Sequence, residues 1–268
     1  MSKLLRVALL LGLAAFYCGA VEAETRPRVT RLETEPKSIL YVGNSFFYYN
    51  NGIDSLVQGL HAAAEPGQSL GGAMVTIGGA GWKWHDVDSY FRPDALNSFG
   101  RDGEGTVKFY NTTGKLFDTA VMMDCSYCTT DPELKKIFFD YARRHSETVR
   151  RHGAAPVFFM TWGYADRPEM TATIAEAYTR AGNDNDALVI PVALAFARVR
   201  RDRPDIDLNI FDKQHPTLAG SYLAACTIYA SLFGRSPAGL KYDDGVPRSV
   251  ARRLQEAAWA TVQEYYGR

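Results

Sequence analysis

A serine and an aspartate–histidine pair occur in contexts that suit nucleophilic chemistry. Ser45 follows an apolar run that ends in a glycine and an asparagine, and Asp212 precedes His215 by three residues. A serine hydroxyl becomes a good nucleophile when a base removes its proton and a third group orients that base. The spacing predicts that Asp212 and His215 leave one turn toward the same side. The order Ser, Asp, His excludes nothing, because triads are defined by geometry.

Each of these residues also has a simpler interpretation. Ser45 alone would cap a helix, and His215 would merely pack beside Asp212. Pro216 and Thr217 place His215 in a loop just before a helix, exposed at the rim. Together the residues favour Ser45 as nucleophile, His215 as base and Asp212 as orienting acid. At a helix start, the N–H of Ser45 would also face a developing oxyanion, aided by the helix dipole.

The remaining histidines are weaker candidates for the base. His145 and His152 lie in an arginine-rich helical segment and are expected on a solvated face, and His61 is expected on a helix surface. His85 is the second choice, because it lies near a predicted strand end and beside two tryptophans that would border a pocket.

Length and composition indicate one globular domain. The 268 residues are 46% hydrophobic, enough for one large core. Lys plus Arg and Asp plus Glu number 30 each, so the overall charge gives no reason to expect a nucleic-acid partner.

The chain begins like an exported protein. Basic residues precede an apolar stretch from Val7 to Val21, and Val21 and Ala23 fit a cleavage site near Ala23. The stretch is shorter than the about 20 residues of a membrane-spanning helix, and bulky aromatics before Cys18 disfavour lipid anchoring. We therefore expect a signal peptide over 1–23, a polar lead-in over 24–37 and a single domain over 38–268. The protein is predicted to be secreted or periplasmic, without stable membrane insertion after processing.

Three cysteines remain after processing. Export makes a disulfide between Cys125 and Cys128 possible, whereas Cys226 is expected to pack in a helix as a small hydrophobe. No further Cys or His stands at a spacing that would complete a zinc site, and no cofactor or metal is predicted.

Apolar runs alternate with helical patterns, which predicts βαβ units and a parallel sheet. The expected strands are Ser38–Gly43, Ala73–Gly78, Thr119–Met123, Ala155–Thr161 and Ala187–Val192. The expected helices are 132–152, Pro168–Ala181, Thr217–Leu232 and Arg248–Tyr266, and the glycine-rich segment 82–110 is interpreted as an insertion. Ligands bind beyond the carboxyl ends of parallel strands. There we expect Ser45 together with the segments Gly78–Gly81, Asp124–Ser126 and Trp162–Tyr164.

The combined motifs resemble the SGNH/GDSL hydrolase superfamily. The sequence has Ile-Leu-Tyr-Val-Gly-Asn-Ser-Phe around Ser45, a glycine block after the second strand, and Asp-x-x-His-Pro-x-x-x-Gly beginning at Asp212. The closest branch also carries His-Pro-x-x-Ala-Gly-x-Tyr-Leu-Ala-Ala, which begins here at His215. The resemblance covers most of residues 38–235.

The resemblance implies a flavodoxin-like three-layer α/β/α sandwich with strand order 2-1-3-4-5 and the Ser45, Asp212 and His215 triad. It also implies oxyanion donors from Ser45 and from a glycine, Gly81 or alternatively Gly79. The family's third donor is an asparagine after the third strand, and this chain has none there. Ser126 or a backbone N–H replaces it, or that donor is missing. The Gly-Asn-Asp at 182–184 stands in the wrong place and is interpreted as a helix-ending loop.

The expected activity is hydrolysis of acyl esters, acetyl esters in particular, through an acyl-serine intermediate. Aromatic residues near the rim suggest a carbohydrate ester substrate. The predicted substrate-binding residues are Trp82, Trp84, His85, Trp162 and Tyr164. Alternatives are an acyltransferase using the same triad, a catalytically inactive carbohydrate-binding protein, and, ranked last, a metal-dependent hydrolase using Asp184, Asp186 and Asp212. Asn111 matches a glycosylation acceptor.

Overall fold

A five-stranded parallel sheet forms the centre of the molecule, with strand order β2-β1-β5-β6-β7. The computed structural model describes residues 26–96, 99–101, 106–109 and 114–268. The expected signal peptide and Asn111 lie outside these residues. The order and the parallel pairing confirm the predicted fold class. The strands are β1 Ser38–Gly43, β2 Gly71–Thr76, β5 Thr119–Met122, β6 Ala155–Phe159 and β7 Leu188–Ile190.

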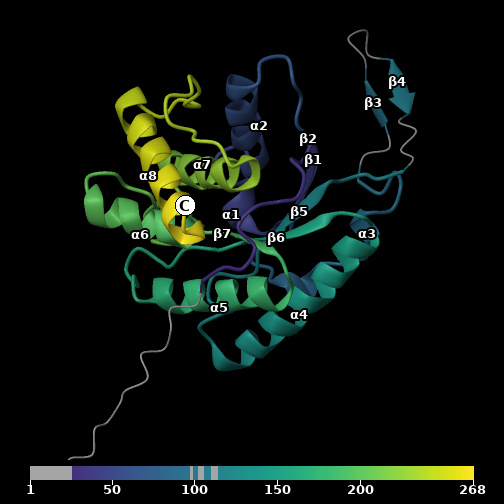
Figure 1. The fold of residues 1–268 in the computed structure, drawn as a ribbon, viewed down its shortest axis with the longest axis horizontal. Helices are drawn as coiled ribbons and strands as arrows, with labels where there is room; N and C mark the ends of the chain where they lie inside the picture. The colour runs from purple at the N-terminus through teal and green to yellow at the C-terminus, as the bar shows by residue number, and fades with distance from the viewer. Residues whose placement is uncertain (1–25, 97–98, 102–105, 110–113) are drawn as a thin grey trace, which may run out of the picture.

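Helices cover both faces of this sheet (Figure 1). One core contains Ile39 and Tyr41 of β1 and the other contains Leu40 and Val42, so alternate side chains of one strand enter opposite layers. The helices of the first layer are α2 Ile53–Ala64, α6 Val192–Asp202, α7 Leu218–Phe233 and α8 Arg248–Tyr266, and those of the second are α4 Pro132–Arg151 and α5 Met170–Asp184.

The segment interpreted as an insertion contains small elements. They are the 3-10 turn η1 Trp82–Trp84, the helix α3 Val87–Tyr90 and the antiparallel strands β3 Phe99–Arg101 and β4 Val107–Phe109. In Figure 1 the pair β3 and β4 projects away from the main sheet. Trp82 and Val87 enter the second core, which fixes the start of the insertion against α4.

Several predicted boundaries differ from the structure, and two of them have identifiable reasons. The strand β2 begins at Gly71, because Gly71 and Gly72 pair with Ser38 and Ile39 of β1 despite the low strand propensity of glycine. The helix α5 continues through the Gly-Asn-Asp at 182–184, which is not a helix-ending loop. A Cβ at Gly182 would lie 2.3 Å from Val189, so the glycine permits close helix–strand packing there.

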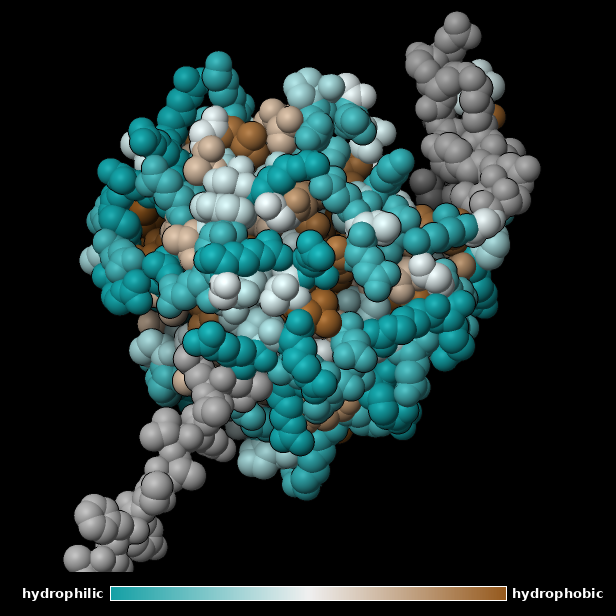
Figure 2. Space-filling view, in the orientation of Figure 1, coloured by the Kyte–Doolittle hydropathy of each residue, from teal (hydrophilic) through white to brown (hydrophobic). Residues whose placement is uncertain are grey.

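Polar side chains cover most of the face in Figure 2, and hydrophobic residues are visible there only in small areas. None of the helices that the structure describes combines the length and the hydropathy needed to cross a bilayer. Before β1, Arg28 donates its backbone N–H to Asn183 of α5 at 2.7 Å, which ties the polar lead-in to the domain.

Candidate active site

Ser45 is held at the carboxyl end of β1 by a tight strand-to-helix turn. It is the first residue of α1 Ser45–Tyr48, and the preceding Asn44 caps this helix by accepting the N–H of Phe46 at 3.2 Å. A Cβ on Gly43 would lie 2.6 Å from Met123, so glycine is required for the close passage of the chain. The helix has only four residues, so the expected assistance from its dipole is small.

Asp212 and His215 belong to one turn, as their spacing predicted. One oxygen of Asp212 accepts the N–H groups of Gln214 and His215, both at 2.9 Å, and its other oxygen contacts Nδ1 of His215 at 2.5 Å. Lys213 adopts a left-handed conformation with φ of 66°, which closes the turn. Two backbone atoms and one ring atom therefore fix the carboxylate relative to the imidazole.

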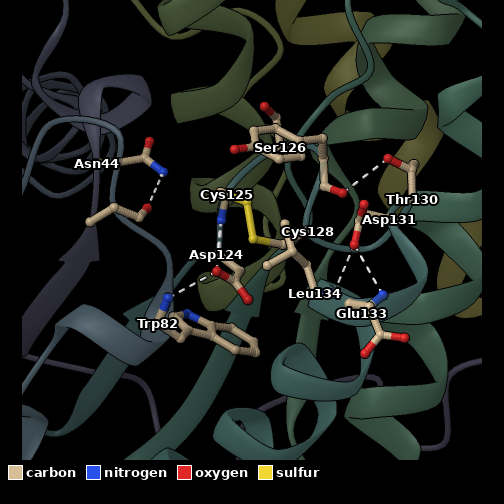
Figure 3. The surroundings of a disulfide bond; sticks show 12 residues. Asn44, Trp82, Asp124, Cys125, Ser126, Cys128, Thr130, Asp131, Glu133 and Leu134 are labelled. Carbon is tan, nitrogen blue, oxygen red and sulfur yellow. Dashed lines mark hydrogen bonds between the residues drawn. A yellow bond between two sulfur atoms is a disulfide. The ribbon is translucent and has the colours of Figure 1, made fainter.

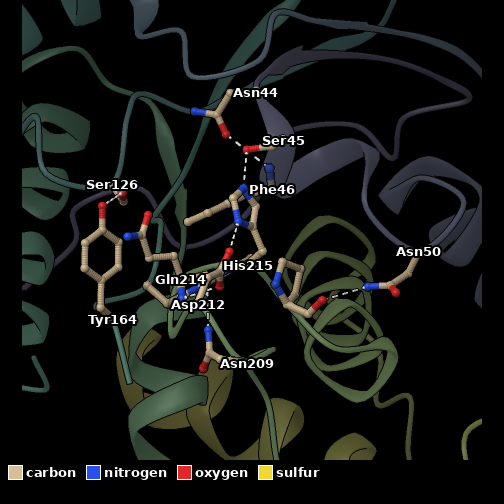
Figure 4. Close-up of polar contacts among 12 residues, drawn as sticks. Asn44, Ser45, Phe46, Asn50, Ser126, Tyr164, Asn209, Asp212, Gln214 and His215 are labelled. Carbon is tan, nitrogen blue, oxygen red and sulfur yellow. Dashed lines mark hydrogen bonds and ion pairs between the residues drawn. The ribbon is translucent and has the colours of Figure 1, made fainter. Parts of the chain in front are cut away.

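The turn brings His215 to the serine. Nε2 of His215 lies 2.9 Å from Oγ of Ser45, across 170 residues of sequence (Figure 4). Because the Asp212 carboxylate only accepts, Nδ1 carries the ring proton and Nε2 is free to accept from the serine hydroxyl. The structure thus brings together the three residues predicted as a triad.

The electrostatics favour an ionised orienting acid. Burial alone would raise the pKa of Asp212, but hydrogen bonds from the His215 ring and from two backbone N–H groups outweigh burial and lower its pKa. An anionic Asp212 would stabilise an imidazolium if His215 took a proton.

Aromatic and polar neighbours that the sequence did not identify position the imidazole and its turn. Tyr49 stacks on the His215 ring with centroids 4.4 Å apart, and Phe46 contacts it edge-on at 5.6 Å. Asn50 donates to the carbonyl of Pro216 at 3.1 Å. Tyr49 and Asn50 follow Ser45 closely in the sequence, and this proximity was the available signal.

A second set of contacts supports the turn from the side of β6. Nε1 of Trp162 and Nδ2 of Asn209 both donate to the carbonyl of Gln214, at 2.9 Å each. Arg200 of α6 in turn donates to Asn209 at 2.7 Å and to the carbonyl of Gly163 at 3.0 Å. These contacts hold the loop after β6 and the acid–base turn together.

Three predicted substrate-binding residues do not have accessible side chains, and those predictions were wrong. Trp82 is wholly buried and packs on Phe138, and Trp162 is buried between Phe46 and Phe196 at 4.3 Å from each ring. His85 is buried, and its Nε2 donates to the carbonyl of Gly43 at 3.0 Å. These buried side chains pack beneath the loops of the site and do not line its surface.

His85 is also unsuited to act as a base. Burial is the main cause that lowers its pKa to about 4, so the ring is neutral and its Nε2 proton is held by Gly43. Two other histidines expected on surfaces are buried as well. His145 contacts the carbonyl of Trp82 at 3.0 Å, and His61 packs against Phe233.

Trp84 and Tyr164 remain accessible. Trp84 is 71% exposed, and Tyr164 is partly buried with its hydroxyl 2.7 Å from the hydroxyl of Ser126. Figure 4 draws the Ser126–Tyr164 pair in the same view as Ser45 and His215. The side chains of Trp84 and Tyr164 are thus accessible to a ligand at the carboxyl ends of the strands.

The loops after β2 and β5 meet beside Asn44, the residue that precedes Ser45 (Figure 3). Nδ2 of Asn44 donates to the carbonyl of Ala80 at 3.0 Å, which brings the next residue, Gly81, near the serine. Gly79, on the other side of Ala80, lies in an exposed turn with φ of 70°. Within the described ranges, the backbone N–H groups of Ser45 and Gly81 donate to no other group.

A disulfide joins Cys125 and Cys128 in the loop after β5, and the buried Cys226 is free. Asp124 and these two cysteines are the only group of potential metal ligands that the described residues bring together, and the two sulfurs are bonded to each other. Asp184, Asp186 and Asp212 form no such group. The metal-dependent alternative therefore lacks its ligand cluster in this part of the chain.

No protein-family model matches the sequence, and no curated protein matches it. Among solved structures, a DUF4886 family protein from Bacteroides uniformis has a TM-score of 0.60 at 18% identity, covering 85% of this chain and 95% of that one. A protein assigned as an SGNH hydrolase, from Slackia heliotrinireducens, has a TM-score of 0.53 at 25% identity, covering 73% and 98%. A catalytic mutant of an acetylxylan esterase from Geobacillus stearothermophilus has a TM-score of 0.52 at 14% identity, covering 76% and 96%.

These similarities define the class of the fold. The chain has an SGNH hydrolase-like fold, with the parallel sheet and the flanking helices that this class requires. Esterases and other hydrolases are among the proteins that share this architecture with it.

Proposed function

We propose that the protein is a serine ester hydrolase that cleaves short acyl esters, acetyl esters in particular, through an acyl-serine intermediate. The observation that carries the proposal is the continuous contact from Oγ of Ser45 to Nε2 of His215 at 2.9 Å and from Nδ1 to Asp212 at 2.5 Å. Nucleophile, base and orienting acid in this relation are the requirement for acyl transfer.

The reaction proceeds in two steps. Oγ of Ser45 attacks the acyl carbonyl while its proton moves to Nε2 of His215, and the tetrahedral intermediate then expels the alcohol, which takes that proton. Water next attacks the acyl-serine, gives its proton to His215 and releases the carboxylic acid, and the proton returns to Ser45. Asp212 stays ionised throughout and stabilises the imidazolium.

The oxyanion is stabilised by donors on adjoining loops. In this proposal the N–H groups of Ser45 and Gly81 point at the developing charge, and Gly79 is the less suitable glycine because it lies in an exposed turn. The hydroxyl of Ser126 takes the place of the missing asparagine side chain. When Ser126 donates its single hydroxyl proton to the oxyanion, the hydroxyl of Tyr164 donates to the Ser126 oxygen.

Exposed aromatic residues support a carbohydrate as the alcohol part of the ester. The four exposed aromatic side chains among the described residues each lie within three positions of a proposed site residue. They are Tyr48, Trp84, Tyr127 and Phe211. Aromatic rings bind the apolar faces of sugar rings by stacking, and the fold similarity to an acetylxylan esterase agrees with an acetylated sugar as substrate.

Hydrolysis of 4-nitrophenyl acetate tests the proposal. The wild type should release nitrophenol above the buffer rate, and Ser45→Ala should reduce release to the background. A matched control is His152→Ala. His152 forms an exposed histidine–aspartate contact with Asp88 at 2.9 Å, and neither residue belongs to the proposed site. Full activity in folded Ser45→Ala would show that another nucleophile acts. Transfer of acetyl to an added sugar in preference to water would indicate an acyltransferase.

We also propose that the protein is exported after cleavage near Ala23. The Cys125–Cys128 disulfide supports export, because such bonds persist in oxidising compartments. Mass spectrometry of protein recovered outside the cytoplasm tests this, with Glu24 expected as the first residue.

A further inference from the structure

Asp124 is a buried carboxylate at the carboxyl edge of the sheet, two residues beyond the end of β5. Its side chain forms none of the ion pairs found among the residues that the structure describes, and it is only 2% exposed. Removal of a carboxylate from water without a cationic partner is unfavourable. The contacts that Asp124 makes in return therefore indicate what it does there.

One oxygen of Asp124 joins two loops of the site. Oδ1 accepts the N–H of Trp82 at 2.8 Å and the N–H of Cys125 at 2.8 Å (Figure 3). Trp82 directly follows Gly81 in the loop after β2, and Cys125 directly precedes Ser126 in the loop after β5. The carboxylate thus lies between the residues proposed to supply two oxyanion donors.

The fit around this oxygen is tight. A Cβ added to Gly81 would lie 2.4 Å from Oδ1 of Asp124 and 3.4 Å from Sγ of Cys128. On its other side, the loop after β2 is held by Asn44 through the carbonyl of Ala80. Gly81 therefore stands between Asn44, adjacent to the nucleophile, and Asp124.

Asp124 is itself fixed from the second core. Its backbone N–H donates to the hydroxyl of Tyr178 at 3.1 Å, and Tyr178 is wholly buried on α5 against Phe138 at a centroid distance of 4.9 Å. Asp124 therefore connects the two loops to the buried contacts between α4 and α5.

We propose that Asp124 is a positioning residue, which holds the Gly81 and Ser126 segments so that their donors face the acyl oxygen of an ester at Ser45. This inference depends on the proposed esterase function. In it, Asp124 acts through the Gly81 and Ser126 segments and does not itself contact the substrate. Displacement of one oxyanion donor lowers turnover by a factor of about 10²–10³. Loss of Asp124 should thus act on kcat more than on KM.

The protonation of Asp124 agrees with this role. Burial raises its pKa to about 6, and the hydrogen bonds from Trp82 and Cys125 oppose part of that rise. Above this pH the group is an anion, and hydrogen bonds to a charged acceptor are shorter and stronger than those to a neutral one.

The experiment compares Asp124→Asn and Asp124→Ala with the wild type on 4-nitrophenyl acetate at pH 8. We expect kcat to fall about 10-fold in Asp124→Asn, which keeps a neutral acceptor, and about 10²–10³-fold in Asp124→Ala. KM should change less than about threefold in both. The asparagine variant keeps the test valid if the alanine variant does not fold.

Asp118→Asn is the matched control, because Asp118 also accepts two backbone N–H groups, those of Lys37 at 2.8 Å and Ser38 at 3.1 Å, but at the opposite edge of the sheet. Its kcat should equal that of the wild type. Folded Asp124 variants with wild-type kcat, or an equal loss in Asp118→Asn, would overturn the positioning role. Ser45→Ala, measured in parallel, separates the two proposals: if it stays active, the esterase assignment itself fails.

Discussion

An aspartate that accepts two backbone N–H groups stands at each end of β5, and the two aspartates differ in burial and charge environment. Before β5, Asp118 accepts two backbone N–H groups from the start of β1 and forms an ion pair with Lys115 at 3.1 Å. After β5, Asp124 accepts two backbone N–H groups from loops beside Ser45, but it is buried and forms no ion pair with any described residue.

Their electrostatics differ accordingly. Burial would raise the pKa of Asp118, but the N–H of Lys37 and the charge of Lys115 outweigh it and lower the pKa, whereas burial raises that of Asp124 to about 6. The amino edge is thus arranged for stability. The carboxyl end contains a buried charge that is unfavourable for stability. Groups with such perturbed pKa values are common at functional sites.

The largest of these expected effects is at the acid of the proposed triad. Asp212→Asn should lower kcat by about 10⁴, because an amide can donate to Nδ1 and so favours the wrong tautomer of His215. Esterase assays of purified, folded protein measure this. Asp88→Asn alters the comparable but exposed Asp88–His152 pair and should have no effect. Similar rates in Asp212→Asn and Asp88→Asn would show that the Asp212–His215 pair is no more important for turnover than an exposed surface pair.

A smaller effect is expected from adding one methyl group at Gly81, in the loop after β2. Gly81→Ala should reduce kcat by about 10², because its Cβ would lie 2.4 Å from Asp124 and must displace the proposed donor. Gly71→Ala, at the amino end of the strand, meets nothing closer than 3.5 Å and should leave kcat unchanged. A Gly81→Ala variant with normal turnover would show that this glycine does not stabilise the oxyanion.

The last expected effects are on stability, and they have opposite signs at the two ends of β5. A raised pKa means that wild type loses stability as pH rises from about 4 to about 6, by roughly 3 kcal/mol for a shift from 3.8 to about 6. Asp124→Asn should therefore gain stability relative to wild type between pH 4 and pH 7.

Asp118 should behave in the opposite way. Because its pKa is lowered below the ordinary value of 3.8, its contribution is present at neutral pH and is lost only as pH falls through about 4 and below, so Asp118→Asn should lose stability relative to wild type as pH rises from about 3 to about 5. Urea unfolding across each of these pH ranges measures the two slopes. Slopes of the same sign would contradict the electrostatic difference between the edges.

Much of the fold was predictable because its signals are local or periodic. The apolar runs gave the five strands, and the Asp131 cap and Pro132 gave the start of α4, where Asp131 accepts two N–H groups. The helix α6 was missed, because its first residues, Val192 onward, continue the apolar run of β7 after Pro191. Composition alone does not show where an apolar run changes from strand to helix.

The site was predictable only in part, for a similar reason. The spacing of Asp212 and His215 is a local property, and their turn formed as expected. Trp82 and Trp162 were wrongly predicted to bind substrate, because position near a strand end does not decide to which side of the backbone a side chain points. Both side chains pack in the hydrophobic cores. The loop around Asp124 depends on contacts between distant segments, which no sequence pattern displayed.

Asp212 and His215 share a single short turn. Assembly of the proposed triad therefore requires only one long-range contact, from position 45 to position 215. Local fraying of the one-turn helix behind the serine, or of the loop that bears the imidazole, would break that contact while the sheet stays intact. Mild heat or denaturant should for this reason silence turnover before the circular-dichroism signal of the helices begins to fall.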